Sequence, residues 1–434
     1  MPYVLGIDIG GTSTSAAVSR LRGTAWTRPE VVQLDARSAA VPSVLHLGAN
    51  GSLLVGEPER HSGGPDGGQI ARGFWRRIGD DVPLMVGGEA CSAQTLTAVL
   101  AMWIVEQVVV REGGHPESIV LSHPAGWGPY RRELLLEALW DIGLTNVTLL
   151  PEPVTVAESH AARGFTGATA AVYSLGGDSF EASLVRQAQH AGFEPFGFPQ
   201  GLEPAGGVDF DEALADHVRT VLARELDRKV DPTAPFALLG LARECARAKQ
   251  DLTMMTETDI VVRLPRGPAR VPVTRVEFED MIRPAVQVTV DLLARTVRSA
   301  GLAPNELDAV LLAGGSARIP LVTELLAAQF PVPIEVQPDA QATAATGAAL
   351  AACQIVSPPQ PRRRPEPGRP GRPGQTPELG AGGREPAVRS DRPGDQLRTG
   401  RGEPPPRPPV RVSPLELPAG NRLIPGRGRG RGRG

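Results

Sequence analysis

The stretch VLGIDIGGTSTSAAV, residues 4–18, combines a buried-looking strand, a turn of glycines and small hydroxyl residues, and a second strand. Glycines let backbone N–H groups approach phosphate oxygens, and Ser and Thr hydroxyls add further donors. An aspartate just before such a turn, here Asp8, is placed to hold a hydrated Mg²⁺ through its waters. The phosphate-binding candidates of this turn are Gly10, Gly11, Thr12 and Ser13. Taken alone, the stretch fits a tight β-turn that requires glycine equally well.

A second stretch, VYSLGGDSFEASLV (residues 172–185), aligns with the first when Gly176 and Gly177 are placed on the two glycines of the first turn. Each half of the folded region thus opens with the same kind of hairpin. This repeat predicts a duplicated, two-lobed protein with a cleft between two phosphate-binding turns. One difference raises a question of chemistry, because Ser174 stands where the first hairpin has Asp8.

Apolar runs and helix-period segments alternate along the chain, which predicts an α/β fold. Strands are expected over residues 3–9, 14–20, 43–48, 118–124, 170–176, 180–187, 259–265 and 309–315. Helices are expected over residues 94–111, 130–143, 210–227, 278–301 and 320–330.

A third glycine turn lies in AVLLAGGSARIPLVTELL, residues 309–326, where it follows a strand and opens a helix. It suits contact with a nucleoside, and Arg318 would stack its guanidinium plane on a base; the alternative is an ordinary strand-to-helix turn. The chain has no GxxxxGK[ST] string, and its only GxGxxG-like string lies in the C-terminal Arg-Gly repeat, so neither a P-loop nor a Rossmann fold is indicated.

The C-terminal segment has a different composition from the rest. Residues 354–434 contain no Phe, Trp or Tyr and are rich in Pro, Arg and Gly, so we expect a disordered tail. This tail holds 17 Arg against 7 acidic residues, about +10, which leaves about −13 for the rest of a chain of formal charge −3. The folded part is therefore a poor general nucleic-acid binder. Within the chain, only the RG-rich tail is a candidate for weak contact with nucleic acid or an anionic surface, and only its proline runs for protein docking; the alternative, a solubilising or incidental tail, is favoured over both.

The three cysteines, Cys91, Cys245 and Cys353, are widely separated and follow no disulfide or zinc spacing. No basic segment precedes an apolar run at the N-terminus. The most apolar helix-like segment is interrupted by Glu106 and Gln107. We therefore expect a cytoplasmic protein without a transmembrane span.

With three such turns in this order, the chain resembles the actin-like ATPase superfamily and, within it, the DnaK-type seventy-kilodalton heat-shock chaperones. The resemblance covers about residues 3–352. It rests on the ordered set GIDIGGTS, VPSVLHLGANGSLLVGEPER, SHPAGWGPYRRELLLEALWDIGL, LLPEPVTVAESHAARG, YSLGGDSFEASL, PAGGVDFDEAL, ECARAKQDL and AGGSARIPLV. A sugar kinase or a bacterial actin is not expected to share the VPS, PEPxxxA and ECARAKQDL segments.

The resemblance implies an actin-like nucleotide-binding domain over residues 1–353, built from duplicated ribonuclease-H-like lobes that each carry a subdomain and close on ATP or ADP with Mg²⁺. Lobe I would span about residues 1–164 plus 340–353, and lobe II about 165–339. The implied catalytic residues are Glu152, Asp8 and Ser179, with Glu152 as the carboxylate that orients or activates the attacking water. An isolated Glu152 would instead be read as a helix N-terminal acid stabilised by the dipole.

The resemblance also assigns nucleotide-binding positions in both lobes. The residues implied on the adenosine side are Lys249 and Thr253 on one helix, with Gly314, Gly315, Ser316 and Arg318 opposite them. The other implied positions are Gly10, Gly11, Thr12, Ser13, Gly176, Gly177, Gly206, Gly207 and Asp339. Pro124, Arg132 and Glu152 match positions that link nucleotide state to lobe movement.

Several departures fall on the chemistry. Trp75 stands at the position of the family's catalytic lysine. Two alternatives are open for a neighbouring arginine, Arg76 or Arg72: it reaches into the site, or it points to the opposite face because a shift of one residue reverses a side chain on an extended segment. Ser174 replaces an aspartate of the metal shell, and Asp178 replaces a glycine of the second turn, where it would repel phosphates unless a cation intervenes. The remaining changes are conservative or local: Ser179 for Thr, Glu181 for Asp, and Ala246 for Glu.

Three functions remain open at this point. The first is an ATP-binding, heat-shock-chaperone-like protein that hydrolyses ATP slowly and acts on protein partners in trans, because no β-sandwich pattern follows Cys353. The second is a non-catalytic ATP-sensing scaffold whose tail recruits partners, indicated by the changes at Trp75, Ser174 and Asp178. The third is a sugar kinase of the same fold, for which no sugar-site motif is visible.

Overall fold

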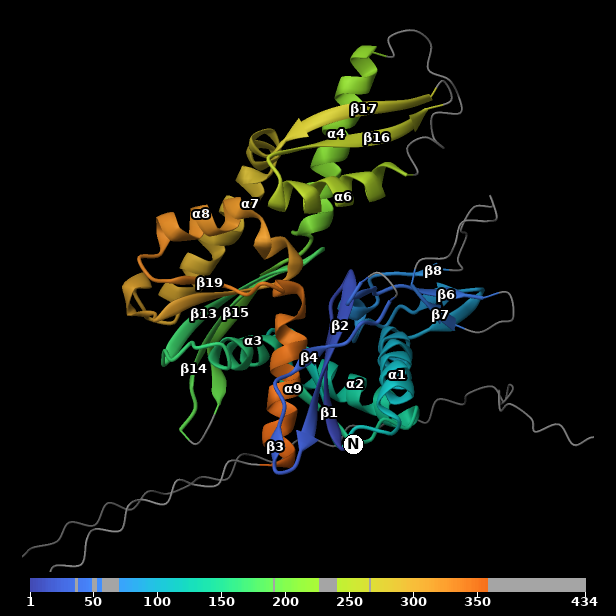
Figure 1. Ribbon diagram of the computed structural model, residues 1–434, viewed down its shortest axis with the longest axis vertical. Coiled ribbons are helices and arrows are strands. Elements are labelled where there is room, and N and C mark those ends of the chain that lie inside the picture. The colour runs from blue at the N-terminus through green and yellow to red at the C-terminus, as the bar shows by residue number, and fades with distance from the viewer. Residues whose placement is uncertain are drawn as a thin grey trace, which may run out of the picture. The chain divides into compact units, whose positions relative to one another are not determined.

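Two mixed sheets form the framework of the protein (Figure 1). The computed structural model describes residues 1–35, 38–48, 53–56, 70–189, 192–225, 240–264 and 267–357. The first sheet, which we assign to lobe I, contains β1 (Tyr3–Ile9), β2 (Ser13–Arg22), β3 (Ala25–Trp26), β4 (Glu30–Val31), β5 (Val41–Pro42), β11 (Ile119–His123) and β12 (Val147–Pro151). The second, which we assign to lobe II, contains β13 (Thr169–Leu175), β14 (Phe180–Gln187), β15 (Phe193–Leu202), β18 (Ala309–Ala313) and β19 (Ile334–Val336).

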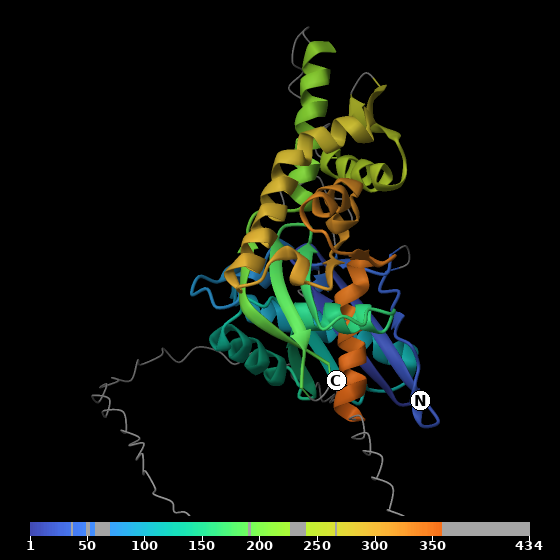
Figure 2. The same cartoon turned by 90° about the vertical axis from the view of Figure 1, so that its left-hand side faces the viewer.

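Helices and smaller sheets surround these two sheets (Figures 1 and 2). The helices are α1 (Ala93–Glu112), α2 (Pro129–Asp141), α3 (Glu152–Ala161), α4 (Gly207–Glu225), α6 (Leu241–Met254), α7 (Arg275–Ser299), α8 (Pro320–Gln329) and α9 (Thr343–Val356). Short 3₁₀ turns are η1 (Trp75–Arg77), η2 (Pro304–Glu306), η3 (Gly315–Arg318) and η4 (Ala340–Ala342). The small sheets pair β6 (Leu45–Leu47) with β7 (Leu53–Val55) and β8 (Ile70–Ala71), β9 (Leu84–Val86) with β10 (Glu89–Cys91), and β16 (Glu257–Leu264) with β17 (Gly267–Thr274).

The two sheets have the same strand topology. In the first, β1 pairs antiparallel with β2 and parallel with β11, and β11 pairs parallel with β12. In the second, β13 pairs antiparallel with β14 and parallel with β18, and β18 pairs parallel with β19. The parallel connections run through helices, as a parallel crossover requires. The internal repeat seen in the sequence therefore corresponds to a duplicated fold.

Helix α9 joins the two halves at their base. It packs on β1, β2 and β11 and crosses α3, an arrangement visible from two directions (Figures 1 and 2). The contact with α3 is so close that a Cβ at Gly347 would lie 1.6 Å from the carbonyl oxygen of Thr155. A side chain at this position would push α9 and α3 apart. This close packing places Glu152, at the start of α3, beside the strands of both sheets.

Each sheet has its own apolar core. The core of the first sheet contains Leu5, Ile7, Leu96 and Leu121, and it extends to Phe74 and Trp75. The core of the second sheet contains Tyr173, Phe180, Val290 and Leu312. Apolar side chains at alternating strand positions and helical spacing supply both cores, which is the pattern that predicted these elements.

All the strands and helices expected from the periodicity are present within the described residues, with shifted ends. The periodicity missed several other elements. The longer missed elements are the strands β12, β15, β17 and β19 and the helices α3, α6 and α9; the short strands β3, β4, β5, β7, β8, β9 and β10 were missed too. Helix α3 begins with Glu152 and Pro153, and α9 is rich in alanine, so neither has an apolar stripe on a polar background. Helix α9 continues to Val356, past the expected boundary at residue 353; the predicted tail beyond residue 357 lies outside the described residues.

Helix α1 differs from the expectation for its segment. By length and composition alone, it is the one helix among the described residues that is long and apolar enough to cross a membrane. Half of its most apolar window is buried inside the protein, and Leu96, Leu100 and Ile104 belong to the core of the first sheet. Such a helix is weak evidence for a span, because core helices pass the same test.

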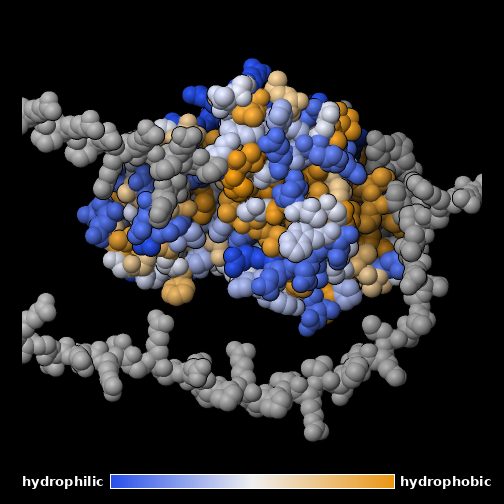
Figure 3. All heavy atoms as spheres, turned by 90° about the horizontal axis from the view of Figure 1, so that it is seen from below, coloured by the Kyte–Doolittle hydropathy of each residue, from blue (hydrophilic) through white to orange (hydrophobic). Residues whose placement is uncertain are grey.

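Hydrophobic and hydrophilic residues are interspersed on the face of the protein shown in Figure 3.

Candidate functional site

A cavity of about 560 Å³ lies where the two hairpin turns face one another. It is lined by residues of both sheets and of the elements around them. The sequence-predicted site residues in its wall are Asp8, Gly10, Gly11, Thr12, Ser13, Glu152, Gly176, Gly177, Ser179, Lys249, Thr253, Gly314, Gly315, Ser316 and Arg318. These positions span more than 300 residues of sequence, so only the tertiary fold brings them together.

The two turns have the same backbone geometry and touch one another. The N–H of Gly10 donates to the Ser13 carbonyl at 2.9 Å, and the N–H of Gly176 donates to the Ser179 carbonyl at the same distance. A Cβ at Gly177 would lie 2.1 Å from Thr12 Oγ1, so no other residue fits there without moving the first turn. The glycine at this position is therefore required by the close approach of the lobes as well as by the turn.

Gly206 and Gly207 are absent from the cavity wall but support it. The N–H of Gly207 donates to the Gly176 carbonyl at 3.1 Å, and a Cβ at Gly206 would lie 2.8 Å from the backbone of Gly177. These contacts anchor the start of α4 to the second turn. Asp339 is also absent from the wall; it is the N-cap residue of η4, and its carbonyl accepts a hydrogen bond from Thr343 Oγ1 at 3.2 Å.

Lys249 connects two helices beside the cavity. Its Nζ donates to the Gly207 carbonyl at 2.6 Å and lies 2.8 Å from Asp211 Oδ1. The lysine thereby links α6 to the start of α4, while Thr253 lies one turn further along α6. Both residues line the cavity, as the resemblance implies, but the ammonium group is already paired with protein oxygens.

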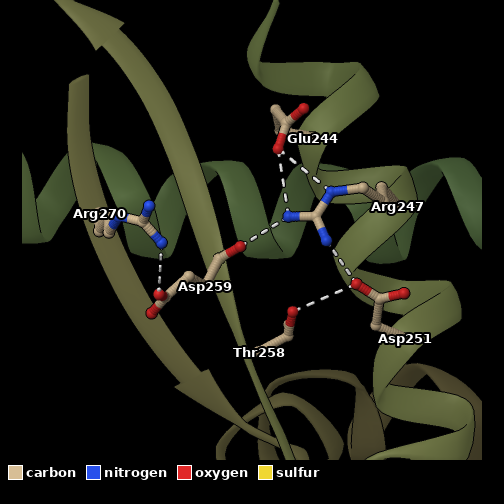
Figure 4. A network of polar contacts seen from close by, with 6 residues as sticks. All are labelled: Glu244, Arg247, Asp251, Thr258, Asp259 and Arg270. Carbon is tan, nitrogen blue, oxygen red and sulfur yellow. Dashed lines mark hydrogen bonds and ion pairs between the residues drawn. The ribbon is translucent and has the colours of Figure 1, made fainter.

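A polar network on α6 fixes the position of this helix (Figure 4). The guanidinium of Arg247 lies between Glu244, at 3.2 Å, and Asp251, and it also donates to the backbone carbonyl of Asp259 on β16 at 2.6 Å. Thr258 Oγ1 donates to Asp251 Oδ2 at 3.2 Å. The network holds α6 against β16, and we infer that it sets the position of the two α6 residues in the cavity wall.

Three carboxylates gather at the inner end of the cavity. Asp8 accepts a short hydrogen bond from Ser122 Oγ, Glu152 Oε1 accepts one from Ser174 Oγ at 2.5 Å, and Glu181 accepts from the N–H of Ala125 at 3.1 Å. Removal from bulk water raises the pKa of Asp8 to about 6. The same cause, followed by the charges of Asp8 and Glu181, raises the pKa of Glu152 to about 8. Glu152 therefore holds its proton at neutral pH when no cation is nearby.

The register of the two hairpins explains the position of Ser174. In the first hairpin Asp8 on β1 faces Ser15 on β2, whereas in the second Ser174 on β13 faces Glu181 on β14. The acid and the serine have exchanged strands between the two halves. The hydroxyl of Ser174 then donates to Glu152, so this serine contacts the carboxylate directly.

Trp75 and Arg76 occupy different surroundings although they are neighbours. Trp75 is 5% exposed and packs on Trp127 with ring centroids 4.6 Å apart, and the ring of Trp127 stacks on His123. Arg76 reaches the second lobe, where its Nε lies 3.2 Å from Asp178 Oδ2. Both residues line the cavity.

Of the two alternatives for the arginine beside Trp75, the structure therefore shows the one in which Arg76 reaches into the site. The segment is the 3₁₀ turn η1 rather than an extended strand. Successive side chains on a 3₁₀ helix are about 120° apart instead of on opposite faces, so two neighbours can line the same cavity. Arg72 is not among the lining residues.

Sequence reasoning missed several residues of the wall. Ser122, His123, Gln250 and Gln341 all line the cavity. His123 Nε2 is buried without a hydrogen-bond partner among the described residues, and burial lowers the pKa of the ring, which keeps it neutral at pH 7. Gln341 donates from Nε2 to Ser13 Oγ at 3.0 Å. The only sequence signals for them were their places at the end of a strand or beside a predicted site residue.

The residues implied to couple the site to lobe movement are not all in the wall. Pro124 lines the cavity, and its carbonyl accepts a hydrogen bond from His123 Nδ1 at 2.8 Å. Arg132 lies outside the cavity wall on α2, with its Nε buried and unpartnered among the described residues. The coupling role of these positions stays a prediction.

The carboxylate cluster suits a cation held through water. Burial raises the pKa of each of the three acids, and the acidic neighbours of Glu152 raise its pKa further. A divalent cation would lower the energy of the ionised forms of all three acids. Among the described residues, no three His, Cys, Asp or Glu side chains are placed to coordinate a metal directly. An ion that keeps most of its waters, as Mg²⁺ does, fits this arrangement. Asp8 and Glu152 would hold it through those waters.

Comparison with known proteins gives the following matches. A family model described as Hsp70 protein matches residues 79–363. The chain is 25% identical over 337 residues to the chaperone protein DnaK of Thermosipho melanesiensis, which covers 75% of this chain and 54% of that protein. The chain thus spans about half the length of this relative. The first glycine turn lies before the range that the family model matches.

Proposed function

Because the chain belongs to the Hsp70 family and has its actin-like ATPase fold, we propose that it binds ATP and ADP with Mg²⁺ in the cavity and hydrolyses ATP slowly. The observation that carries the proposal is the meeting of two glycine turns and a nucleoside-side wall around one cavity. The two turns would grip the phosphates with backbone N–H groups and hydroxyls. Thr253, Gly314 and Arg318 would surround the nucleoside.

Glu152 is the residue we assign to the attacking water. A carboxylate must be ionised to accept a proton from water, and the pKa of about 8 leaves Glu152 largely protonated at neutral pH. A bound Mg²⁺ would supply positive charge that stabilises the phosphates and the ionised acids. Glu152 in its ionised form would then orient the water, while Ser174 fixes the side chain by its hydrogen bond.

Slow turnover is expected from the departures in the site. The position implied for a catalytic lysine holds Trp75, which is packed in the core of the first sheet and carries no charge. Loss of one electrostatic catalytic contact typically reduces a rate by about 10²- to 10³-fold. The arginine that follows Trp75 in the cavity wall, Arg76, is paired with Asp178.

Single-turnover hydrolysis tests the proposal. Purified full-length protein is mixed with limiting ATP and Mg²⁺, and phosphate release is compared with that of the Glu152→Gln variant, after calorimetry has shown that both bind ATP. Release that depends on Glu152 supports slow hydrolysis. Equal phosphate release by both proteins would refute ATP hydrolysis, and absence of ATP binding would refute the whole proposal.

A second candidate function is favoured by the uncharged, buried Trp75 at the position implied for a catalytic lysine and by the carboxylate of Asp178 in the second turn. In this alternative the protein is a non-catalytic ATP sensor, whose lobes close on ATP and whose partners read the closure. Binding of ATP without phosphate release that depends on Glu152 would support this alternative. A sugar kinase is the least supported reading, and phosphorylation of any member of a panel of sugars would revive it.

The biological role also remains a proposal. The relative is named a chaperone protein, and we propose a chaperone-type role for this chain, with protein partners engaged in trans by the lobes or by the Pro-rich segment beyond residue 357. Contact of the RG-rich segment with nucleic acid or anionic surfaces, and a cytoplasmic location, stay predictions from the sequence.

A further inference from the structure

The carboxylate of Asp178 lies between the two glycine turns. A Cβ at Gly11 would lie 2.2 Å from Asp178 Oδ2, so this oxygen rests against the face of the first turn. On the other side, the same oxygen is 3.2 Å from Arg76 Nε. A side chain of the second turn thus reaches across to the first turn and pairs with a cation of lobe I.

Asp178 also uses donors that the phosphates need. Its own backbone N–H and the hydroxyl of Ser179 lie close enough to its carboxylate to favour the ionised form. Backbone N–H groups and hydroxyls of such turns are the groups that hold phosphate oxygens. The carboxylate therefore occupies, from within the protein, donors placed for an external anion.

The ion pair is shielded from bulk water. The side chains of Asp178 and Arg76 are 12% and 31% exposed, respectively. Opposite charges at this distance interact more strongly in a shielded cleft than on the surface. A phosphate that enters the cavity would therefore meet a bound carboxylate rather than an open turn, and the two anions would repel one another.

We propose that Asp178 is an internal anion that occupies part of the phosphate site, and that the terminal phosphates of a nucleoside triphosphate displace it from Arg76, which then contacts the phosphates. This inference rests on the proposed nucleotide binding and goes beyond it. It makes Asp178 a specificity-determining residue, because the cost of displacement falls on polyphosphate ligands and not on adenosine. Arg76 then supplies the positive charge that is missing at the position of Trp75.

The test compares adenosine, ADP and ATP, the last two with Mg²⁺, by titration calorimetry of the full chain. In the Asp178→Asn variant we expect ATP to bind about 10-fold or more tightly, as for release of a charge-assisted contact, with the adenosine affinity unchanged. If Asp178 were instead a ligand of the metal, this variant would weaken ATP binding in Mg²⁺. Weaker or unchanged ATP binding overturns the proposal.

Arg76→Gln separates contact with phosphate from a merely structural pairing. We expect it to weaken ATP binding in the wild-type chain and also in the Asp178→Asn background. If Arg76 only pairs with Asp178, it would have no effect in that background, and this outcome refutes its contact with phosphate. A circular dichroism melt of each variant shows that it is folded.

A second arginine–aspartate pair on the same segment provides the matched control. Arg77 Nε lies 3.2 Å from Asp80 Oδ2, the same separation, but both side chains are more exposed and neither lines the cavity. Asp80→Asn and Arg77→Gln should leave all three affinities unchanged. If no ligand binds any variant, the proposed function and this inference fail together; if adenosine and ATP bind but ignore Asp178, only this inference fails.

Discussion

Substitution of Glu152 by glutamine should remove part of the pH dependence of stability. The pKa of Glu152 is 4.5 in an unfolded chain and about 8 in the folded protein. The folded state thus binds this proton more tightly, and the unfavourable ionisation lowers stability as the pH rises from about 4.5 to about 8. One pKa unit corresponds to about 1.4 kcal/mol, so between pH 6 and pH 9 Glu152 should reduce the unfolding free energy by about 2–3 kcal/mol.

Glutamine cannot ionise, but its carbonyl oxygen can still accept the hydrogen bond from Ser174. The variant should therefore lose less stability than the wild type over this pH window and be the more stable protein at pH 9. The raised pKa of Asp8, about 6, affects mainly a lower pH range and remains in the variant. The difference between the two proteins thus isolates Glu152.

The assay is urea unfolding of the nucleotide-free full chain at pH 6, 7, 8 and 9, followed by tryptophan fluorescence. Urea is chosen over guanidinium chloride because it leaves electrostatic interactions unscreened. Glu137→Gln, at an exposed position of α2, is the matched control and should follow the wild type. If wild type and Glu152→Gln lose stability in parallel from pH 6 to pH 9, the reasoning about the buried carboxylate cluster is wrong.

Three further predictions concern the walls of the cavity. Trp75→Lys should lower the unfolding free energy by about 3–5 kcal/mol, because it removes a buried ring. Combined with Ser174→Asp, it should raise the single-turnover rate of ATP hydrolysis. An unchanged rate would show that these two positions do not limit hydrolysis. Gly177→Ala should weaken ATP binding in calorimetry, because its Cβ would lie 2.1 Å from a hydroxyl oxygen of the facing turn, whereas Gly128→Ala, with no atom within 4 Å, should not. Arg247→Ala should loosen α6 and weaken adenosine binding a few-fold, whereas Arg219→Ala, at an exposed position of α4, should leave the adenosine affinity unchanged. If calorimetry gives Arg247→Ala the same affinity as the wild type, Arg247 does not support the adenosine site.

Much of the fold could be predicted from local patterns. The repeat of strand, glycine turn and strand predicted the duplication, because the same short-range geometry is encoded in both copies. Most of the described strands and helices with clear apolar periodicity were also predicted, with α6 as an exception. Helix α3 was missed because it begins with Glu152 and Pro153, and helix α9 was missed because it is rich in alanine around most of its surface. The burial of both helices is decided by their packing against each other.

The candidate site was predicted unevenly. Residues in glycine turns were found, because a turn that binds phosphate needs glycine and hydroxyl residues in sequence. His123 and Gln341 were not found, because nothing in their local sequence marks them and they reach the cavity through strand pairing and helix packing. The orientation of Arg76 stayed open, since an isolated sequence does not distinguish a 3₁₀ turn from an extended segment.

The sequence by itself determined the two hairpins, the third glycine turn and the identity of the unusual residues at Trp75, Ser174 and Asp178. Only the tertiary structure decided what those residues touch. Asp178 meets Arg76 across about 100 residues of chain, and the raised pKa of Glu152 comes from burial and from two acids, Asp8 on β1 and Glu181 on β14. Local geometry depends on neighbours in sequence, whereas charge interactions and desolvation depend on neighbours in space, so the chemistry of the cavity becomes visible only in the folded chain.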